Sequence, residues 1–185
     1  MRVYVARHAR TDWNDQGRIQ GQANTVLNKL GLQQAKDLAR ALGTVCPSPL
    51  GVASSDLHRA RQTTEVVALT LDLVTIYDRR LRECHFGRLD GMLREDIRRQ
   101  RGDAYIDQEN HRYDFRNVGG EDHEQVLNRQ LSALRDLYRK SQLENWLLVG
   151  HGRSLGTLLR FFDHHKIAEQ GDFAVVDLNT ERLFS

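Results

Sequence analysis

Short apolar runs alternate along this chain with longer segments whose apolar residues recur at helical spacing, and this alternation constrains the fold more than any other feature. We expect strands at residues 2–6, 50–54, 73–77, 146–149 and 173–178, and a further short edge strand at residues 183–184. We expect helices at residues 32–42, 57–71, 94–101 and 123–139, and from residue 154 onward. Because alternating strands and helices build parallel sheets covered on both faces, the sequence predicts an α/β fold, a three-layer α/β/α sandwich with a mostly parallel central sheet.

Two helix boundaries carry local signals. Gly43 follows the first long apolar stripe and marks an expected helix stop. Ser55 and Asp56 precede the second stripe, and either side chain is a typical N-cap for the helix that we expect from Leu57.

The chain shows no sign of division into separate domains. No repeat, low-complexity tract or block of like charge interrupts it, so we expect one domain spanning residues 1–185. Residues 84–122 are polar, dotted with glycine and irregular, which favours a cap-like insert within that domain. The apolar runs are too short to cross a bilayer, and Arg7 and His8 interrupt the N-terminal run before a signal segment could form.

The two cysteines and the net charge restrict the expected cellular location and the expected binding partners. Cys46 and Cys84 belong to no CxxC pair, so we expect two free thiols and a cytoplasmic location. The net charge of +2 is too small to indicate a nucleic-acid or membrane surface. We therefore expect a small-molecule substrate as the main partner, and a monomer or a homodimer.

Polar side chains follow four of the predicted strands at the point where each strand ends. Arg7 and His8 follow the first strand, residues 54–59 the second, Glu83 lies a few residues past the third, and residues 150–152 follow the fourth. Because ligands of open α/β sheets bind beyond the carboxyl ends of the strands, we expect these side chains to line one site.

The residue types at this edge suit phosphoryl transfer, which needs positive charge around the equatorial oxygens, an in-line nucleophile and an acid for the leaving oxygen. Arg7 and Arg59 can supply the charge, and Arg59 falls in a first helical turn, where free backbone N–H groups also favour an anion. A neutral imidazole at His8 can attack phosphorus directly. His151 can bind a phosphate oxygen as a charged donor, and Glu83 is the candidate acid.

Five segments, in order along the chain, resemble the signature elements of the histidine phosphatase superfamily, which includes the cofactor-dependent phosphoglycerate mutases. Residues 7–21 (RHARTDWNDQGRIQG) resemble its RHGxTxxN-xxx-RxxG element, and residues 54–63 (SSDLHRARQT) resemble its SSxLxRAxQT element. The remaining three segments, LRECHFGRLDG at 81–91, GGEDHEQVLNR at 119–129 and LLVGHG at 147–152, are similar to its LxExxFGxxEG, GES and VxHG elements. The resemblance covers residues 2–159, which is most of the chain.

The resemblance implies roles for individual residues. His8 would be the phosphorylated nucleophile, and Glu83 would protonate the leaving oxygen and then take a proton from the attacking water. The phosphate pocket would consist of Arg7, Asn14, Arg59 and His151. The candidate substrate-binding residues are Gln20, Gly21, His85 and Gly152.

The sequence departs from the family pattern at three positions near the predicted site. Ala9 stands where the family usually has glycine, which indicates that neither a positive φ nor a close backbone approach is essential there. Arg10 replaces the more usual glutamate or glutamine and adds a cation at the predicted pocket mouth. Asp122 replaces the usual serine of the GES element. None of the three changes removes a predicted catalytic group.

Three functions stay open at this point. A phosphatase lets water reach the phosphohistidine, whereas a mutase excludes water and returns the phosphoryl group to a sugar acid. The chain between Glu83 and His151 and the tail after it are shorter than the insert and tail that the resemblance implies for mutases. This favours a phosphomonoester hydrolase acting on small phosphorylated metabolites such as sugar phosphates. A catalytically inactive phosphate-binding module is the third alternative, and it would be expected to lack His8, Arg59 or His151.

The remaining histidines and arginines bear on cofactors and on substrate. No HExxH or Cys/His ligand spacing occurs, so we expect no metal and no cofactor, and an enzyme of the metal-independent histidine acid phosphatase type. Arg10, His85, Arg88 and Arg112 predict a cationic rim. Such a rim would suit sugar phosphates or phosphorylated acids with a second negative group.

Overall fold

The computed structural model describes residues 1–46, 50–102, 113–140, 143–165 and 168–185, and within them five strands form one sheet of order β3-β2-β4-β1-β5. The strands are β1 (Arg2–Arg7), β2 (Gly51–Ser54), β3 (Thr75–Tyr77), β4 (Asn145–Gly150) and β5 (Phe173–Asp177). Strand β4 pairs in parallel with β1 and β2, β2 pairs in parallel with β3, and only β5 runs antiparallel, beside β1. The mostly parallel sheet predicted from the sequence is confirmed.

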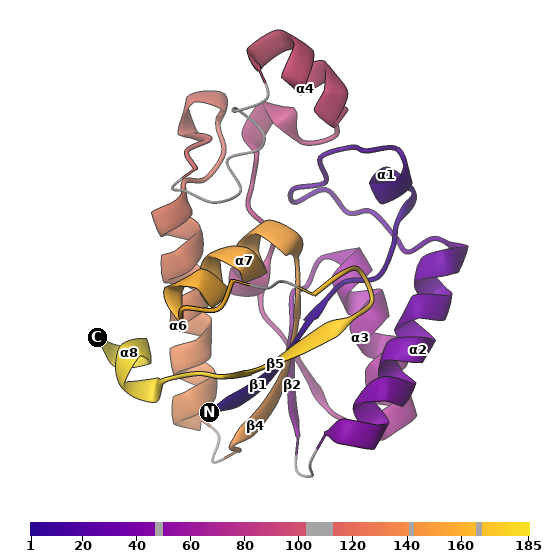
Figure 1. Cartoon of the computed structure of the whole chain (residues 1–185), viewed down its shortest axis with the longest axis vertical. Helices are drawn as coiled ribbons and strands as arrows, with labels where there is room; N and C mark the ends of the chain where they lie inside the picture. The colour runs from indigo at the N-terminus through magenta and orange to yellow at the C-terminus, as the bar shows by residue number, and fades with distance from the viewer. Residues whose placement is uncertain (47–49, 103–112, 141–142, 166–167) are drawn as a thin grey trace.

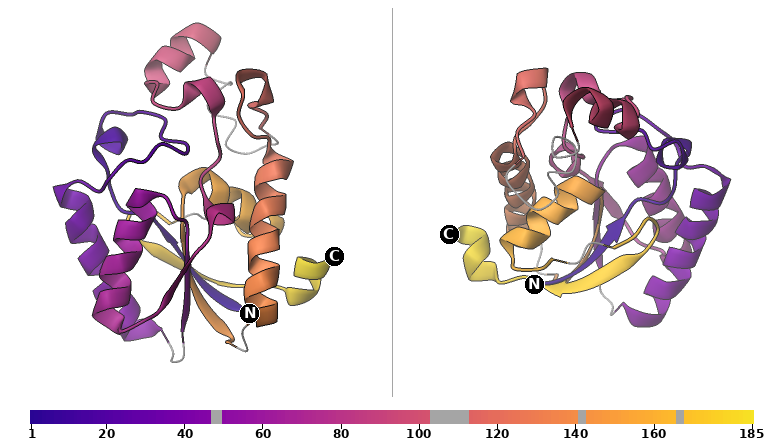
Figure 2. Two further views of the ribbon diagram at one scale, coloured as in Figure 1. Left: turned by 180° about the vertical axis from the view of Figure 1, so that it is seen from behind. Right: turned by 45° about the horizontal axis from the view of Figure 1, so that its top comes forward.

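Helices cover both faces of this sheet (Figure 1). Helices α2 (Lys29–Val45) and α3 (His58–Leu71) lie on one face, and α6 (His123–Lys140) and α7 (Gly152–Phe161) lie on the other, as two further views show (Figure 2). Successive residues of a strand point to opposite faces, and the core follows this rule. Val3 and Val5 enter the core beneath α6 and α7, whereas Tyr4 and Ala6 enter the core beneath α2 and α3. The predicted three-layer α/β/α sandwich is therefore confirmed.

Three local predictions are corrected by the structure. Gly43 does not end its helix, because α2 continues to Val45 and the missing Cβ of Gly43 lets Leu71 of α3 pack against it; a Cβ there would lie 3.0 Å from the Leu71 side chain. The N-cap of α3 is Leu57, not Ser55 or Asp56.

The contacts of Asp56 explain why it does not cap α3. The Asp56 carboxylate is bound by both Nε and Nη2 of Arg82, each at 2.6 Å, so it is not available as a helix cap.

Residues 183–184, predicted as an edge strand, belong instead to the short helix α8 (Thr180–Phe184). The Asn179 side chain accepts the first N–H groups of α8, and Leu183 then enters the core beneath α6 and α7.

A group of short elements lies beyond the carboxyl ends of the parallel strands (Figure 1). They are α1 (Asp12–Asp15), η1 (Arg79–Leu81), η2 (Gly87–Leu89), α4 (Arg94–Arg101) and η3 (Arg116–Val118). The described residues of the predicted insert at 84–122 contribute to an apolar core that also contains Ile19, from the loop after α1, and Val126 of α6. That core includes Cys84, Phe86, Leu89, Ile97, Tyr113, Phe115 and Val118. Arg112, predicted to contribute to a cationic rim, lies outside the described residues.

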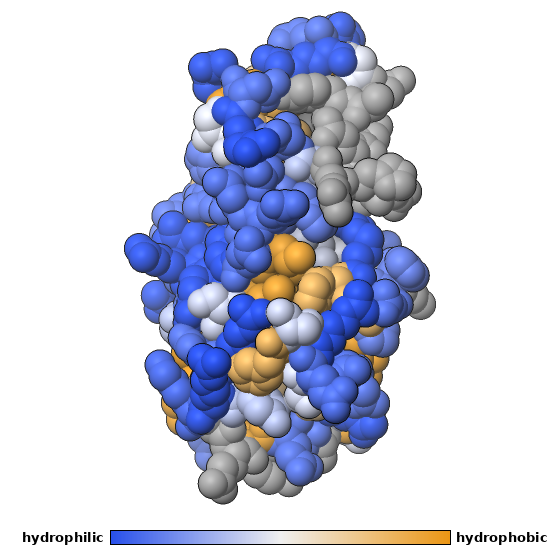
Figure 3. Space-filling view, turned by 90° about the vertical axis from the view of Figure 1, so that its left-hand side faces the viewer, coloured by the Kyte–Doolittle hydropathy of each residue, from blue (hydrophilic) through white to orange (hydrophobic). Residues whose placement is uncertain are grey.

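The surface gives further observations on setting and partners. In the described part of the chain, no helix has the length and apolar character that crossing a membrane requires. Cys46 and Cys84 are both free thiols, as predicted. The face beside α6 and α8 is largely hydrophilic, with a small apolar area in its middle (Figure 3). Whether the protein is a monomer or a homodimer stays a prediction.

Substitution of Gly87 tests how closely the chain at Gly87 packs against the chain at Val118, beyond the carboxyl ends of the strands. Its φ is +62°, and a Cβ there would lie 2.0 Å from the carbonyl oxygen of Val118. We expect Gly87→Ala to lower the free energy of unfolding by about 1–3 kcal/mol in urea titrations, because it adds a backbone clash to a strained φ. Gly102→Ala is the matched control, since Gly102 has a φ of +81° but open space around it. Equal losses in the two variants would contradict the packing role of Gly87.

Candidate active site

His8 lies directly after β1, at the carboxyl edge of the sheet, and is 3% exposed. Its Nδ1 lies 2.8 Å from the carbonyl oxygen of Ala9. A carbonyl oxygen can only accept, so Nδ1 carries the proton and Nε2 keeps its lone pair. The main chain thus selects the tautomer in which Nε2 can act as a nucleophile.

The surroundings of His8 keep its ring neutral. Burial lowers the pKa of His8 well below its usual range, and the positive charges of Arg59 and Arg7 lower it further. Only a neutral imidazole has a lone pair to offer phosphorus, so burial and the two arginines keep His8 in the form that can act as a nucleophile.

Arg59 lies in the first turn of α3, as predicted, and is only 1% exposed. Its Nη2 donates to the carbonyl oxygen of Gly21 at 2.7 Å, and its Nη1 donates to that of Ala23 at 2.8 Å. Burial lowers the pKa of the Arg59 guanidinium to about 10, which leaves it charged at neutral pH. The loop after α1 therefore binds the Nη1 and Nη2 groups of this guanidinium, whereas its Nε has no hydrogen-bond partner.

Arg7 ends β1 and packs against the start of α7. A Cβ on Gly152 would lie 3.1 Å from the guanidinium carbon of Arg7, closer than an ordinary van der Waals contact, so glycine at position 152 favours this packing. The Arg7 Nε is buried and has no hydrogen-bond partner. Gly152 thus supports Arg7 rather than offering a side chain of its own.

His151 caps β4 and is fully buried, with its ring centroid 5.2 Å from that of His8. Its Nε2 lies 2.8 Å from the Ser55 hydroxyl, which accepts the N–H of Leu57 and is free to donate its own proton. That arrangement leaves Nδ1 as the donor, and Nδ1 has no partner. Burial lowers the pKa of His151 well below its usual range, and the positive charge of Arg59 adds to the effect. That His151 binds a phosphate oxygen as a charged donor stays a prediction.

The unpartnered buried donors define what this site can bind. Arg7 Nε, Arg59 Nε and His151 Nδ1 are all buried without partners, and the charges of Arg7 and Arg59 act on both His8 and His151. Buried polar groups are rarely left unpaired, and each unpaired one costs free energy. A tetrahedral oxyanion beside His8 would supply acceptors to these donors.

Glu83 lines the same cavity as His8, lies at the N-terminus of α7 and is 9% exposed. Its Oε1 accepts the N–H groups of Cys84 at 2.9 Å and Ser154 at 2.8 Å, and its Oε2 accepts that of Arg153 at 3.2 Å. His151, the N-cap residue, makes no side-chain cap bond, so Glu83 satisfies the free amides of this helix. The predicted acid is therefore held at the site by the helix that follows His151.

Asn14, Gln20 and Gly21 line the same cavity as His8. The amide oxygen of Asn14 accepts from the N–H of Thr11 at 3.1 Å and from its hydroxyl at 2.9 Å, which leaves the amide nitrogen as the group that can donate to a ligand. Gly21 has a φ of +46°, and a Cβ there would clash with the Asp90 carboxylate. The Gly21 carbonyl accepts from Arg59, so Gly21 positions a residue of the predicted phosphate pocket.

The cavity has a volume of about 520 Å³ and extends well beyond His8. Its outer wall includes side chains that the sequence analysis missed: Arg18, Arg94, Arg153, Arg160 and His165. Arg153 and Arg160 are seven residues apart on α7 and so share a helix face, a spacing that could have been read from the sequence.

Three predicted rim residues do not line this cavity. His85 turns to the carbonyl oxygen of Gly119, 3.1 Å from its Nδ1, and lies near the Asp90 carboxylate. Arg10 pairs with Asp15 instead of pointing into the cavity. Arg88 is also absent from the lining residues. Arg18, Arg94, Arg153 and Arg160 line the cavity instead.

Two departures from the family pattern have local explanations. Ala9 is buried, its φ is not positive, and its N–H donates to the Thr63 hydroxyl at 3.0 Å, so alanine fits without strain. Asp122 accepts the N–H of Gln125 at 2.8 Å, while the Gln125 side chain accepts the N–H of Asp122 at 3.0 Å. This reciprocal pair is a capping box, in which aspartate serves as well as serine.

A site of this kind is typical of enzymes that transfer phosphoryl groups through histidine: a buried neutral imidazole lies among unpartnered cationic and N–H donors, and a carboxyl group lines the same cavity. The sequence profile of the histidine phosphatase superfamily (branch 1) matches residues 3–182. The chain therefore belongs to this superfamily. Within the described residues, no three His, Cys, Asp or Glu side chains come together in a way that could hold a metal ion.

Several known proteins resemble the chain. A metal-independent phosphoserine phosphatase of Arabidopsis thaliana is 34% identical over 154 residues, which is 81% of this chain and 63% of the plant protein. The chain thus matches less than two thirds of that relative's length. A probable phosphoglycerate mutase GpmB of Salmonella paratyphi A is 33% identical over 86% of this chain and 73% of its own length.

Solved structures show the same likeness. The structure of a mycobacterial glucosyl-3-phosphoglycerate phosphatase with VO3 superimposes with a TM-score of 0.79 at 30% identity, over 88% of this chain and 82% of the other. A Thermus thermophilus protein superimposes with a TM-score of 0.74 at 29% identity, over 96% and 94% of the two chains.

The tautomer of His8 can be tested directly. Because its pKa is lowered, His8 should stay neutral at about pH 6, just below the ordinary imidazole pKa of about 6.5. Long-range ¹H–¹⁵N spectra should show its proton on Nδ1, bonded to the Ala9 carbonyl. A charged His8 at that pH, or a proton on Nε2, would contradict the geometry.

Proposed function

We propose that this protein is a metal-independent phosphomonoesterase that works through a phosphohistidine intermediate on His8. The observation that carries this proposal is the set of buried, unpartnered donors of Arg7, Arg59 and His151 around a ring whose Nδ1 is fixed by the main chain. Such a site stabilises three equatorial oxygens while Nε2 attacks in line.

The first chemical step transfers the phosphoryl group to the enzyme. Nε2 of His8 forms a bond to phosphorus as the bond to the leaving oxygen breaks, and Arg7 and Arg59 bind the negative charge of the equatorial oxygens. Glu83, protonated at this stage, gives its proton to the leaving oxygen so that the product departs as an alcohol.

The second step returns the enzyme to its starting state. Glu83, now a carboxylate, takes a proton from a water molecule, and the resulting hydroxide equivalent attacks phosphorus and displaces Nε2 of His8. Inorganic phosphate leaves and Glu83 is again protonated. The same residue serves both steps because the leaving alcohol and the attacking water occupy the same side of the phosphoryl group.

For the substrate we propose small phosphorylated metabolites, such as sugar phosphates. The cavity of about 520 Å³ has room for much more than a phosphoryl group. The relatives named above are described as acting on phosphoserine and on glucosyl-3-phosphoglycerate, both small phosphomonoesters. We propose further that residues 84–122 act as a cap over this cavity and that the enzyme is cytoplasmic. The GpmB relatives make a mutase the alternative that an assay has to address.

The covalent intermediate is the first test. Enzyme mixed with a ³²P-labelled phosphomonoester and quenched should carry an acid-labile, base-stable phosphoryl group on His8, located by peptide mapping. His8→Ala should abolish turnover while leaving the unfolding transition in place, and activity should survive chelators. A label on another residue would overturn the mechanism. Transfer of the label to a second phosphoglycerate position instead of water would identify a mutase.

Glu83 is tested by varying the leaving group. We expect Glu83→Gln to lower kcat/KM for alkyl phosphates by about 10²–10⁴-fold, because a poor leaving group needs the proton. For aryl phosphates, whose leaving groups need little protonation, the loss should be much smaller. The amide also retains an oxygen that can accept the Ser154 N–H, so the fold around α7 should persist. Equal losses on both substrate classes would point to another proton donor.

A further inference from the structure

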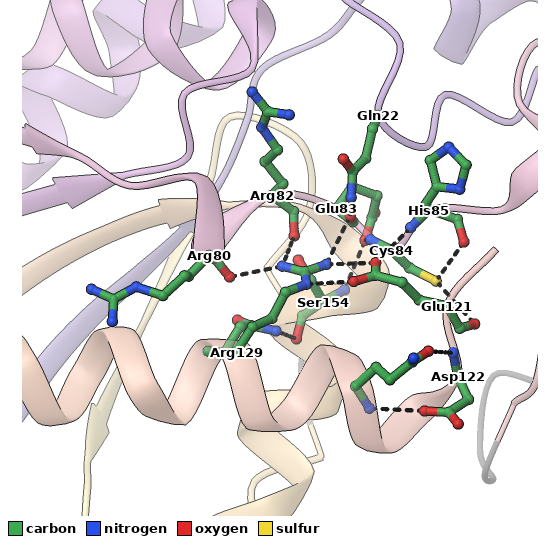
Figure 4. Close-up of polar contacts among 12 residues, drawn as sticks. Gln22, Arg80, Arg82, Glu83, Cys84, His85, Glu121, Asp122, Arg129 and Ser154 are labelled. Carbon is green, nitrogen blue, oxygen red and sulfur yellow. Dashed lines mark hydrogen bonds and ion pairs between the residues drawn. The ribbon is translucent and has the colours of Figure 1, made fainter.

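Arg129, on α6, uses every donor of its guanidinium, and three of them bind the backbone around Glu83 (Figure 4). Its Nη1 donates to the carbonyl oxygens of Arg80 at 2.7 Å and Arg82 at 2.6 Å. Its Nη2 donates to the carbonyl oxygen of Glu83 at 2.9 Å. One side chain thus binds three carbonyls within four residues of a segment that forms only a single turn of 3-10 helix.

The two remaining donors bind Glu121. Nε lies 2.8 Å from Oε1 of Glu121, and Nη2 lies 3.0 Å from Oε2, so the pair is bidentate. Oε2 also accepts the N–H of His85 at 2.8 Å. The ion pair therefore holds the backbone on both sides of Glu83, the carbonyls before it through Arg129 and the amide after it through Glu121.

This arrangement matters because Glu83 is not on a regular element that could aim it. The Glu83 carboxylate reaches the amides of Arg153 and Ser154 only while residues 80–85 keep their path. Gln22 adds one further bond to the Glu83 carbonyl, at 3.1 Å. Arg129 and Glu121 have side chains only 16% and 21% exposed, so their bonds are largely shielded from competing water.

We propose that Arg129, oriented by Glu121, is a positioning residue for the general acid: it fixes the backbone of residues 80–85 and so places the Glu83 carboxyl group at the leaving oxygen. The proposal rests on the proposed function, in which Glu83 protonates that oxygen. Arg129 does not line the cavity, so it acts through Glu83 and not on the substrate.

The chemistry of arginine explains why a lysine would not serve as well. A guanidinium presents five N–H donors in a planar fork, which matches three carbonyls and a carboxylate at once. An ammonium has three donors on a compact head and cannot make all five bonds. Lysine at this position would keep the charge beside Glu121 but leave some of the carbonyls of residues 80–83 without a partner.

The experiment measures kcat/KM of Arg129→Lys and Arg129→Met on a series of alkyl and aryl phosphates. The quantity kcat/KM reports the phosphorylation of His8, the step in which the leaving oxygen takes its proton. We expect Arg129→Met to lower kcat/KM for alkyl phosphates by about 10²-fold, the effect of misplacing a catalytic group by about 1 Å. Aryl phosphates should lose much less, and Arg129→Lys should lie between Arg129→Met and the unchanged protein on the alkyl series.

Arg135→Met is the matched control. Arg135 is on the same helix and also donates to a main-chain carbonyl, that of Leu183 at 2.6 Å, but it lies away from the Glu83 segment. Its loss should lower stability without changing the ratio of alkyl to aryl activity. A double-mutant cycle with Glu83→Gln adds a second criterion. If Arg129 acts through Glu83, Arg129→Met should cause little additional selective loss on alkyl phosphates once Glu83 is already glutamine.

The outcomes separate this proposal from the proposed function. If the unchanged protein forms phosphohistidine and Glu83→Gln is selective for alkyl phosphates, but both Arg129 variants lose equally on the two classes, Arg129 is merely structural and the positioning role is overturned. Full additivity in the cycle would overturn it too. If Glu83→Gln is itself unselective, the assignment of the acid fails instead. Should Arg129→Met not fold, Arg129→Lys and Glu121→Gln apply the same criterion.

Discussion

Positive charge buried beside a histidine is the constraint on which the rest of this structure depends. The Arg59 guanidinium is almost completely buried, yet among the described residues it donates to the carbonyls of Gly21 and Ala23 and to the Thr25 hydroxyl, and to no carboxylate. Arg7 lies close enough for the two charges to disfavour each other. Burying such charges costs free energy that neutral partners offset only in part. The tight loop after α1 and the small residue at position 152 both keep these cations in place.

Much of the site could be predicted because a parallel sheet brings the ends of its strands together. His8 and His151 each directly follow a strand, so a correct assignment of β1 and β4 also placed these residues side by side. Residues farther from a strand end were harder. His85 lies two residues from Glu83 in the sequence, but its ring forms a hydrogen bond with Gly119, far along the chain, and does not line the cavity. The sequence shows Arg129 only as the last residue of the family-like segment at 119–129. Its contacts could not be predicted, because its five hydrogen bonds join segments that no local sequence pattern connects.

Helix α7 connects the aromatic residues Phe86, Tyr113 and Phe115 to the carboxyl edge of the sheet. The Arg153 guanidinium carbon lies 5.3, 4.9 and 5.5 Å from the ring centres of Phe86, Tyr113 and Phe115. The Tyr113 hydroxyl lies 3.0 Å from that of Thr157, one turn farther along the helix. Arginine on an aromatic face is favourable, and here three rings share one cation. Since the Arg153 amide also binds Glu83, the packing of these three rings and the placement of the carboxyl group rest on the same turn of α7.

The order of the strands in the sheet has a consequence for how the protein is made. Strand β1, which carries Arg7 and leads into His8, lies between β4 (Asn145–Gly150) and β5 (Phe173–Asp177). During synthesis both of its neighbours emerge from the ribosome long after it does. Pairings between segments so distant in sequence form slowly, because a long loop must close before they gain any stability. His8 is thus translated early but gains its neighbours in the sheet late, and a nascent chain that lacks β4 also lacks His151, which directly follows that strand.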